Sequence, residues 1–321
     1  MQIEIRRTSE ITIPEWEIYI TAFNEVFEKK YLIEYFKQKY KNTIEGYSYH
    51  AFLKSDDNVV GGCTVIPYEY YFENKIIKIG LAVDVFILPV FRTDPLALFR
   101  MYKQLKKELI VQDIALVIAV PNDTAYPYWK NVVKWKDVGF LNYYTLPLKM
   151  GSILSKIPTV INHLSYVYSR IMIFLSLFLY STERKCKIRI NRNQKIIESQ
   201  RYNQEHIQIR EGNTFASYRI INEDGVNTCY LIDFYNIGKG IKDAPTLRKV
   251  IKKIITSESV DIIIFVGKLM FNQILLLKVP FKFEPKHLYF TADILIPNKI
   301  DSHLIYDIKN WDFGLFNYDV R

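Results

Sequence analysis

Cysteine is scarce in this sequence of 321 residues, which has only Cys63, Cys186 and Cys229. An odd number of widely spaced cysteines excludes a disulfide framework, gives no metal-knuckle spacing, and favours a reducing, cytoplasmic compartment. The five histidines include no pair three or four positions apart, so no resident metal is expected. No Gly-x-Ser-x-Gly elbow is present, which argues against a Ser-His-Asp hydrolase.

Glycine and proline are also few, at 12 residues each. With 49% hydrophobic and 24% charged residues, the chain has enough apolar material for packed cores, and its length favours two domains over one. Lysine and arginine exceed the acidic residues by 43 to 34, a net charge of +9 that favours an anionic partner. No recognition motif accompanies this charge, so nucleic acid is not expected as the partner.

Long hydrophobic runs are missing outside one region, 160–180, whose uninterrupted part at 171–180 has only ten residues. A membrane-spanning helix needs about 20 residues. The basic residues after this region are Arg184, Lys185, Lys187, Arg189, Arg192 and Lys195. We favour a buried interdomain helix, while a helix lying on an anionic bilayer surface and a membrane span stay open as alternatives.

Hydrophobic periodicity predicts a first half that ends with a strand closing a first domain near residue 150. Its predicted elements are two helices within 15–41, strands at 47–53, 59–71 and 76–88, a helix at 96–110, a strand at 114–120, a helix at 125–133 and a strand at 138–147. The crossover helix between two apolar strands implies that those strands pair in parallel.

The second half repeats this order. Its predicted elements are strands at 214–221 and 227–235, a helix at 247–257, a strand at 261–266, a helix near 271–277 and strands within 288–296. One shift of 146 residues places 115–120, 135–136 and 143–145 on similar segments of the second half, which indicates an internal duplication. Two unrelated α/β domains are the alternative. The predicted domains are 1–150 and 201–321, with a linker helix and a basic segment over 151–200.

A candidate anion site lies where the strand ending at Leu88 and Pro89 leads into the helix at 96–110. Arg92 stands in this turn, and the free N–H groups of the first helical turn, with the helix dipole, attract anions. An ordinary turn with a solvated arginine is the alternative.

This turn resembles the signature of the GNAT family, acyltransferases that use acyl-coenzyme A. The family has a strand ending in an apolar residue, any residue and Pro, then Arg or Gln two residues on, then x-x-Gly-x-Gly/Ala, whose backbone N–H groups hold the pyrophosphate. Pro95 replaces the central glycine and removes one N–H donor. The resemblance implies acetyl-coenzyme A or another acyl-coenzyme A as co-substrate. The residues that the resemblance implies for binding this co-substrate are Ile87, Leu88, Arg92, Thr93, Asp94, Leu96, Ala97 and Asn122.

A second segment resembles the family in its Asn-x-x-Ala start, with Asn122 and Ala125 after the strand at 114–120. Asn122 either caps the helix or binds the pantetheine arm or the acceptor. The family's tyrosine, which in many members protonates the leaving thiolate, aligns with Tyr128 or Trp129. Of these two, only the phenol O–H of Tyr128 can act as the acid.

Asp84 matches the acidic residue that many family members carry near the acceptor. It would take a proton from the amine, directly or through water, or anchor the ammonium, whereas a salt-bridged carboxylate is the structural alternative. Glu69 and Asp123 are weaker candidates. We expect Asp84 and Tyr128 to face one cleft, open between the parallel strands.

The resemblance covers about residues 15–148, and the whole chain looks like a tandem GNAT protein, similar to bacterial acyltransferases of cell-surface polysaccharide or peptidoglycan synthesis. It implies an α/β (α+β) fold of two GNAT-like domains, each a mixed, mainly antiparallel sheet with a central parallel strand pair. The expected activity is transfer of an acyl group, acetyl foremost, to the amine of an amino sugar or cell-envelope precursor. The second domain's loop at 238–242 lacks the signature spacing, so the chemistry is expected in the first. The alternatives are a non-catalytic binding module and a membrane-surface enzyme acting on a lipid-linked glycan.

Overall fold

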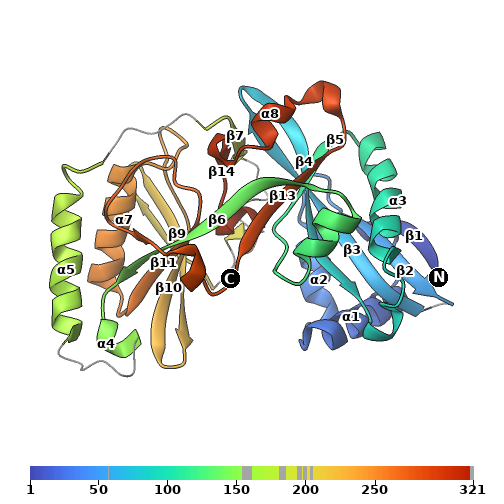
Figure 1. The fold of residues 1–321 in the computed structure, drawn as a ribbon, viewed down its shortest axis with the longest axis horizontal. Helices are drawn as coiled ribbons and strands as arrows, with labels where there is room; N and C mark the ends of the chain where they lie inside the picture. The colour runs from blue at the N-terminus through green and yellow to red at the C-terminus, as the bar shows by residue number, and fades with distance from the viewer. Residues whose placement is uncertain are drawn as a thin grey trace. The chain divides into compact units, whose positions relative to one another are not determined.

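The computed structural model describes residues 1–56, 58–153, 161–180, 186–193, 197, 201–202 and 205–318 (Figure 1). Two compact units emerge. Unit 1 is made of residues 1–140, 188–200 and 288–308, and unit 2 of residues 141–187, 201–287 and 309–321. Each unit is therefore assembled from segments far apart in the sequence.

Unit 1 is built on a mixed sheet in the order β1-β2-β3-β4-β5-β13. Its strands are β1 (Gln2–Arg7), β2 (Tyr49–Ser55), β3 (Asn58–Phe72), β4 (Lys75–Ile87), β5 (Ile114–Ala119) and β13 (Leu288–Ile294). All neighbours are antiparallel except β4 and β5, which are parallel. The predicted meander and parallel pair are thus confirmed, whereas β1 was not predicted. A short strand, β7 (Ile188–Ile190), pairs with the far end of β3.

Helices cover both faces of this sheet. On one face lie α1 (Ile13–Phe27) and α2 (Ile33–Lys41), and on the other lies α3 (Ala97–Val111) (Figure 1). α1 begins at a capping box, because the Thr12 hydroxyl accepts from the Glu15 N–H and the Glu15 carboxylate accepts from the Thr12 N–H. The helix predicted at 125–133 is present over residues 126–132, of which Tyr128–Val132 form the π-helical η3. The shorter elements of unit 1 are η1 (Thr8–Glu10), η2 (Pro89–Phe91), η5 (Pro297–Lys299), α8 (Ser302–Ile305) and the start of η6 (Ile308–Asn310).

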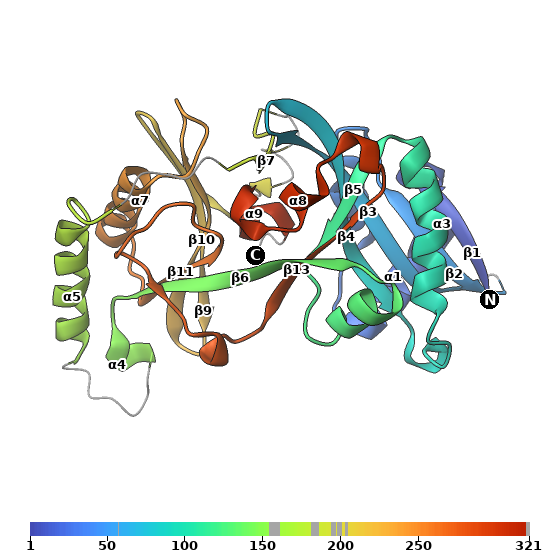
Figure 2. The same cartoon turned by 45° about the horizontal axis from the view of Figure 1, so that its top comes forward.

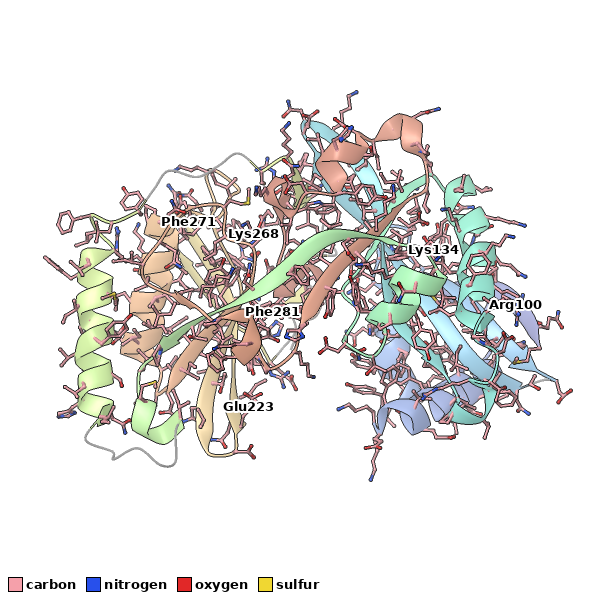
Figure 3. The ribbon with its side chains drawn as sticks, in the orientation of Figure 1. Arg100, Lys134, Glu223, Lys268, Phe271 and Phe281 are labelled. Atoms are coloured by element: carbon pink, nitrogen blue, oxygen red, sulfur yellow. The ribbon has the colours of Figure 1, made fainter. Side chains whose placement is uncertain are left out.

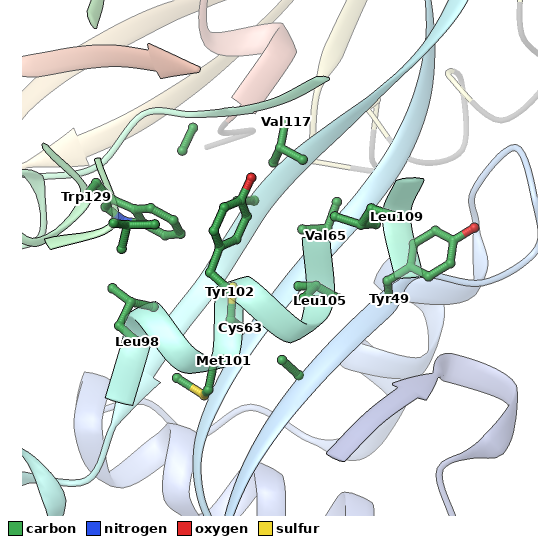
Figure 4. Packing of buried hydrophobic residues seen from close by; sticks show 14 of the residues in the cluster. Tyr49, Cys63, Val65, Leu98, Met101, Tyr102, Leu105, Leu109, Val117 and Trp129 are labelled. Atoms are coloured by element: carbon green, nitrogen blue, oxygen red, sulfur yellow. The ribbon is translucent and has the colours of Figure 1, made fainter. Parts of the chain in front are cut away.

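The core between α3 and the sheet is apolar and closely packed (Figure 4). α3 buries Met101, Tyr102 and Leu105 against Cys63 and Val65 of β3. Spacings of one, three and four residues put these helical side chains on one face, as the sequence pattern predicted.

The opposite face of the sheet carries an aromatic cluster around His50. This histidine is fully buried, its Nε2 lies 2.9 Å from Thr8 Oγ1 and its Nδ1 lies 2.9 Å from Thr64 Oγ1. The rings of Trp16 and Tyr40 meet the imidazole edge to face. Burial lowers the pKa of His50 to about 3, so the ring is neutral at neutral pH.

Stability is expected to fall as the pH is lowered below neutral, because His50 binds a proton in the unfolded chain at a pKa of about 6.5 and in the folded chain only near about 3. The unfolded state then holds more protons, so this residue removes about 2 kcal/mol of stability between about pH 8 and about pH 5. In urea unfolding, His50→Gln should lack this part of the pH dependence of the unfolding free energy. His303 is exposed, so His303→Gln should keep the full pH dependence of stability. An equal pH dependence in the wild type, His50→Gln and His303→Gln would contradict the assignment of this effect to His50.

Unit 2 has a second mixed sheet, in the order β8-β9-β10-β11-β6. Its strands are β8 (Ile207–Glu211), β9 (Thr214–Glu223), β10 (Val226–Asn236), β11 (Ile262–Gly267) and residues 141–147 of β6 (Lys136–Pro147). β10 and β11 are parallel and the other pairs are antiparallel. The mixed sheets and flanking helices of the two units confirm the predicted fold class.

The helices of unit 2 include α4 (Met150–Ile153), α5 (Ile161–Leu175), α7 (Ala244–Ser257) and α9 (Leu315–Tyr318). Its remaining short elements are β12 (Leu277–Lys278), η4 (Phe281–Phe283) and β14 (Trp311–Asp312). The helix predicted near 271–277 is wrong. Gln273 explains this, because its side chain bonds both the N–H and the carbonyl of Leu276, offering the backbone a loop in place of a helix.

Each sheet is completed by a strand from the other half of the sequence. β13 pairs with β5 in unit 1, and residues 142–147 pair with β11 in unit 2, so the strand predicted at 138–147 does not pair with β5. The pairing of β13 with β5 and the pairing of β6 with β11 end with the same hydrogen-bond pattern. The N–H groups of Leu295 and Ile296 donate to Ala115 O, and those of Leu148 and Lys149 donate to Asp261 O. Ala115 and Asp261 are the residues that the shift of 146 matched.

Residues 161–175 of the region 160–180 form α5, which packs Tyr168, Met172 and Ile173 against the core of unit 2 but leaves Leu164 and Phe174 exposed. The expected burial of the apolar face is therefore found on one side of the helix only. Within the described residues, no helix is long and apolar enough to cross a membrane. Of the basic residues that follow, Arg184, Lys185 and Lys195 lie outside the described part of the chain.

Candidate active site

The parallel strands of unit 1 separate partway along their length. β4 and β5 are paired from Lys78 to Leu81, and β4 then continues to Ile87 without β5. Beyond this point β4 carries a bulge, because Asp84 and Val85 together stand opposite Cys63. Asp84 adopts a left-handed φ of +52°, a conformation that costs a non-glycine residue about 1 kcal/mol. A bulge re-aims a side chain, and here it presents a carboxylate where the strands part.

Asp84 is held on the α2 face of the sheet. Lys39 Nζ and Tyr40 OH each donate to Asp84 Oδ2 at 2.6 Å. Burial and the nearby Asp84 charge raise the pKa of Tyr40 well above its ordinary value. Burial alone would lower the pKa of Lys39, but the charge and hydrogen bond of Asp84 together with the nearby Tyr35 and Tyr68 outweigh burial, and the pKa is raised. The phenol therefore stays protonated and the lysine stays charged.

Both hydrogen bonds to this carboxylate end on the same oxygen. Within the described part of the chain, no hydrogen bond reaches Asp84 Oδ1. Asp84 therefore forms the salt bridge of the structural alternative, and its role as an acid-base residue stays a prediction.

The predicted anion site after β4 holds a carboxylate of the protein itself. Asp94 Oδ1 accepts the Leu96 N–H at 3.0 Å, and Asp94 O accepts the Ala97 N–H at 3.2 Å. The Arg100 guanidinium of α3 (Figure 3) forms an ion pair with Asp94 Oδ2. Hydrogen bonding from Arg100 is the main reason that the pKa of Asp94 is lowered. Asp94 thus takes the place of an external anion at this helix start.

The fit of this turn to a pyrophosphate is therefore partial. Leu96 and Ala97, two of the predicted N–H donors, already have acceptors. Arg92 Nε donates to Ile87 O at 2.8 Å, which holds the arginine against the strand end. The N–H groups of Thr93 and Asp94 bond to no group of the described chain. A pyrophosphate could bind the N–H groups of Thr93 and Asp94 and the remaining N–H groups of the Arg92 guanidinium. It would compete with Asp94 for the N–H groups of Leu96 and Ala97.

The other predicted site residues lie after β5. Asn122 Oδ1 accepts the Ala125 N–H at 2.9 Å, which is the capping role, and the residue is exposed. Tyr128 is 50% exposed, whereas Trp129 is buried against Tyr102. The turn that carries Tyr128 therefore packs on the α3 side, and Asp84 points to α2. Because α2 and α3 cover opposite faces of the sheet, the structure does not support the expectation that Asp84 and Tyr128 face one cleft, and their roles stay predictions.

The remaining predicted binding residues, Ile87 and Leu88, are partly buried and pack against the α3 core. The weaker candidate Glu69 accepts from Asn191 Nδ2 at 2.8 Å. Sequence reasoning missed Lys39, Tyr40 and Arg100. Arg100 stands six residues after Asp94, and an acid just before a helix with a base in its second turn was a signal for that pair. Nothing in the sequence linked Lys39 or Tyr40 to Asp84.

Unit 2 has a carboxylate in the corresponding place. β10 and β11 pair from Thr228 to Leu231, a bulge follows, and Asp233 comes directly after it. Asp233 is fully buried, with Tyr202 OH at 3.1 Å and Lys242 Nζ at 3.2 Å, and Lys242 also forms an ion pair with Asp312. Like Asp84, this aspartate has a lysine and a tyrosine as partners.

This second carboxylate is closed off from solvent. All three members of the ion cluster, Asp233, Lys242 and Asp312, are buried. In the loop at 238–242, the N–H groups of Lys239 and Gly240 donate to Asn236, so they do not form an open phosphate nest. The arrangement in unit 1 is the more accessible of the two.

No family model matches this sequence, and no curated protein matches it either. Solved structures do resemble it. A conserved protein of Enterococcus faecalis V583, described as a probable N-acyltransferase, is 13% identical with a TM-score of 0.57, over 92% of this chain and 73% of that one. A GCN5-related N-acetyltransferase from Anabaena variabilis ATCC 29413 is 12% identical with a TM-score of 0.57, over 91% and 73%.

A third similar structure is the N-myristoyltransferase of Saccharomyces cerevisiae with bound myristoyl-CoA, which is 11% identical with a TM-score of 0.54, over 90% of this chain and 82% of that one. At such identities the likeness establishes the fold alone. The chain has the fold of the GCN5-related N-acyltransferases, and the likeness extends over nearly its whole length.

Proposed function

We propose that this protein is an N-acyltransferase that moves an acyl group from acyl-coenzyme A to an amine, with the chemistry in unit 1. The observation that carries this proposal is the bulge at Asp84, which offers a carboxylate oxygen where β4 and β5 part. The acyltransferase fold of the whole chain supports it. The buried counterpart in unit 2 favours unit 1 as the site of reaction.

The reaction needs two proton movements. The amine nitrogen attacks the thioester carbonyl carbon, the carbon–sulfur bond breaks, the amine loses a proton and the thiolate gains one. Asp84 Oδ1 accepts the proton of the amine, directly or through water, and Tyr128 protonates the thiolate. Each such positioned acid or base contributes about 10²- to 10⁴-fold in rate.

For the acceptor we propose the amine of an amino sugar or of a cell-envelope precursor, and for the donor acetyl-coenzyme A. Titration calorimetry with acetyl-coenzyme A and with longer acyl chains tests the donor. A panel of amino sugars, with coenzyme A release as the readout, tests the acceptor. Tight binding without turnover on any amine would contradict the acyltransferase proposal.

Loss of the Asp94 charge is expected to tighten acyl-coenzyme A binding about tenfold, because Asp94→Asn keeps a cap on Leu96 but frees Arg100 for phosphate. Pro95→Gly, which restores an N–H donor, should also tighten binding. Arg92→Ala should weaken it about tenfold to a hundredfold. The matched control is Asp113→Asn, an exposed aspartate of unit 1 paired with Lys299. All are measured by calorimetric titration.

A second function is favoured by the Asp94–Arg100 pair itself. A loop that satisfies its own helix start suits a non-catalytic binding module that has dropped the cofactor. Under this alternative, none of the variants at 92, 94 and 95 changes coenzyme A binding, and the wild-type protein binds no acyl-coenzyme A. That result would make the loop an ordinary turn and remove the main support for catalysis.

A further inference from the structure

Helix α5 carries large apolar side chains on its outward side as well as on the side that packs against unit 2. Its only buried residues are Ser165 and Ser169, and Ser176 is buried in the turn that follows. Each of these hydroxyls donates to a carbonyl of its own helix, three or four residues earlier. On the packed side these serines lie beside Tyr168, Met172 and Ile173, which are partly buried against the core of unit 2, so the apolar side chains on the other side of α5 are additional to those that the core uses.

The outward side of α5 is a row of large apolar side chains, which we call the α5 row. Its members are Leu164, Val167, Ile171 and Phe174 in the helix and Phe178 just after it, and they are between 48% and 69% exposed. Spacings of three and four residues align them along one side, over about 15 Å from Leu164 to Phe174. A contiguous exposed apolar row of this kind marks an interaction surface.

The charged residues within α5 and its neighbour α7 are all positive. Neither α5 nor α7 contains an aspartate or glutamate. α7 lies beside α5 in both views (Figures 1 and 2), and Arg248 Nη1 donates to Ser176 O at 3.0 Å. The basic residues of the two helices are Arg170, Arg248, Lys249, Lys252 and Lys253. Of these cations, Lys253 lies 3.8 Å from the Glu211 carboxylate, an exposed pair. An apolar row on a helix whose one charged residue is Arg170, beside a helix with four cations, complements an anionic, apolar phase.

We propose that α5 docks on the surface of a bilayer that contains anionic phospholipids, with the α5 row below the headgroups and the basic residues of α5 and α7 among them. A second copy of this chain fits less well, because docking α5 on α5 would bring the same cations together with no acidic partner from either helix. The docking is independent of acyl transfer and does not depend on the site in unit 1.

Flotation of the full-length protein with vesicles tests the proposal. Wild-type protein should bind vesicles of phosphatidylcholine and phosphatidylglycerol in equal parts, and bind vesicles of phosphatidylcholine alone far less. Leu164→Glu with Phe174→Glu should weaken binding about a hundredfold, at about tenfold for each apolar side chain. Lys249→Ala with Lys252→Ala should weaken it about fivefold for each charge, and only on the anionic vesicles.

The matched control is Leu32→Glu with Val111→Glu, two side chains of unit 1 that are 71% and 75% exposed. This control makes the same chemical change elsewhere and should bind like wild type. Equal binding by wild type and the α5 double variant would overturn the proposal. So would a dimer in sedimentation velocity that the α5 variant loses, with no vesicle binding by either protein, because the row would then belong to a second copy.

Discussion

Asp84→Asn is expected to lower the rate of acyl transfer by about a hundredfold or more while leaving acyl-coenzyme A binding unchanged. The amide keeps the volume of the side chain and still accepts from Lys39 and Tyr40, but it takes no proton from an amine. The loss should therefore fall on kcat. Tyr128→Phe should reduce the same step by removing the acid that serves the thiolate.

Unit 1 offers a close control for this experiment. Asp293 accepts from Tyr102 OH at 2.8 Å and from Lys106 Nζ at 2.7 Å, both on Oδ2, so it repeats the tyrosine and lysine pair that holds Asp84. Asp293→Asn should cost similar stability and leave the rate of transfer intact. If both variants lose the same activity, Asp84 is only a structural carboxylate and the acid-base assignment fails.

Lys242→Met is expected to lower the unfolding free energy by about 3 to 5 kcal/mol, because it leaves buried charges without their counterion. The ammonium lies between Asp233 and Asp312, and its side chain is 4% exposed. Denaturant unfolding measures the loss.

Removing the acids together with the lysine tests the physical reason. Lys242→Met combined with Asp233→Asn and Asp312→Asn should recover much of the stability, since no unpaired charge remains. Lys239→Met is the surface control. Its ammonium is 3.4 Å from Asp243 on a side chain that is 56% exposed, and the change should stay within about 0.5 kcal/mol. A Lys242→Met protein as stable as the Lys239 control would show that the cluster contributes little.

The local elements of unit 1 could be predicted because short-range patterns determine them. Apolar runs on either side of the turn at Glu73 and Asn74 predicted β3 and β4, and hydrophobic periodicity predicted the helix at 96–110, which is α3. The same reasoning failed at 271–277, where the apolar spacing suits a helix but the Gln273 side chain bonds the backbone of Leu276. Periodicity does not detect a side chain that competes for backbone hydrogen bonds.

Strand exchange between the halves lay beyond any local pattern. β6 and β13 have similar sequences, and the shift of 146 residues matches them, so either strand suits either neighbour. Sequence alone therefore favoured the nearer partner for residues 138–147. The structure pairs them with β11 and gives β5 the distant β13. Which of two similar strands completes a sheet depends on long-range packing.

By itself, the sequence determined the fold class, the order of most elements, and the turn from Ile87 to Ala97 as a segment of interest, because hydrophobic spacing and a Pro-Arg turn are local properties. Only the tertiary structure decided what that turn and Asp84 contact. The left-handed φ of Asp84 arises from pairing β4 with β3, its salt bridge from packing α2 on the sheet, and the exposure of the α5 row from which side of that helix meets unit 2. Each of these depends on residues far apart in the chain, whose proximity no local pattern encodes.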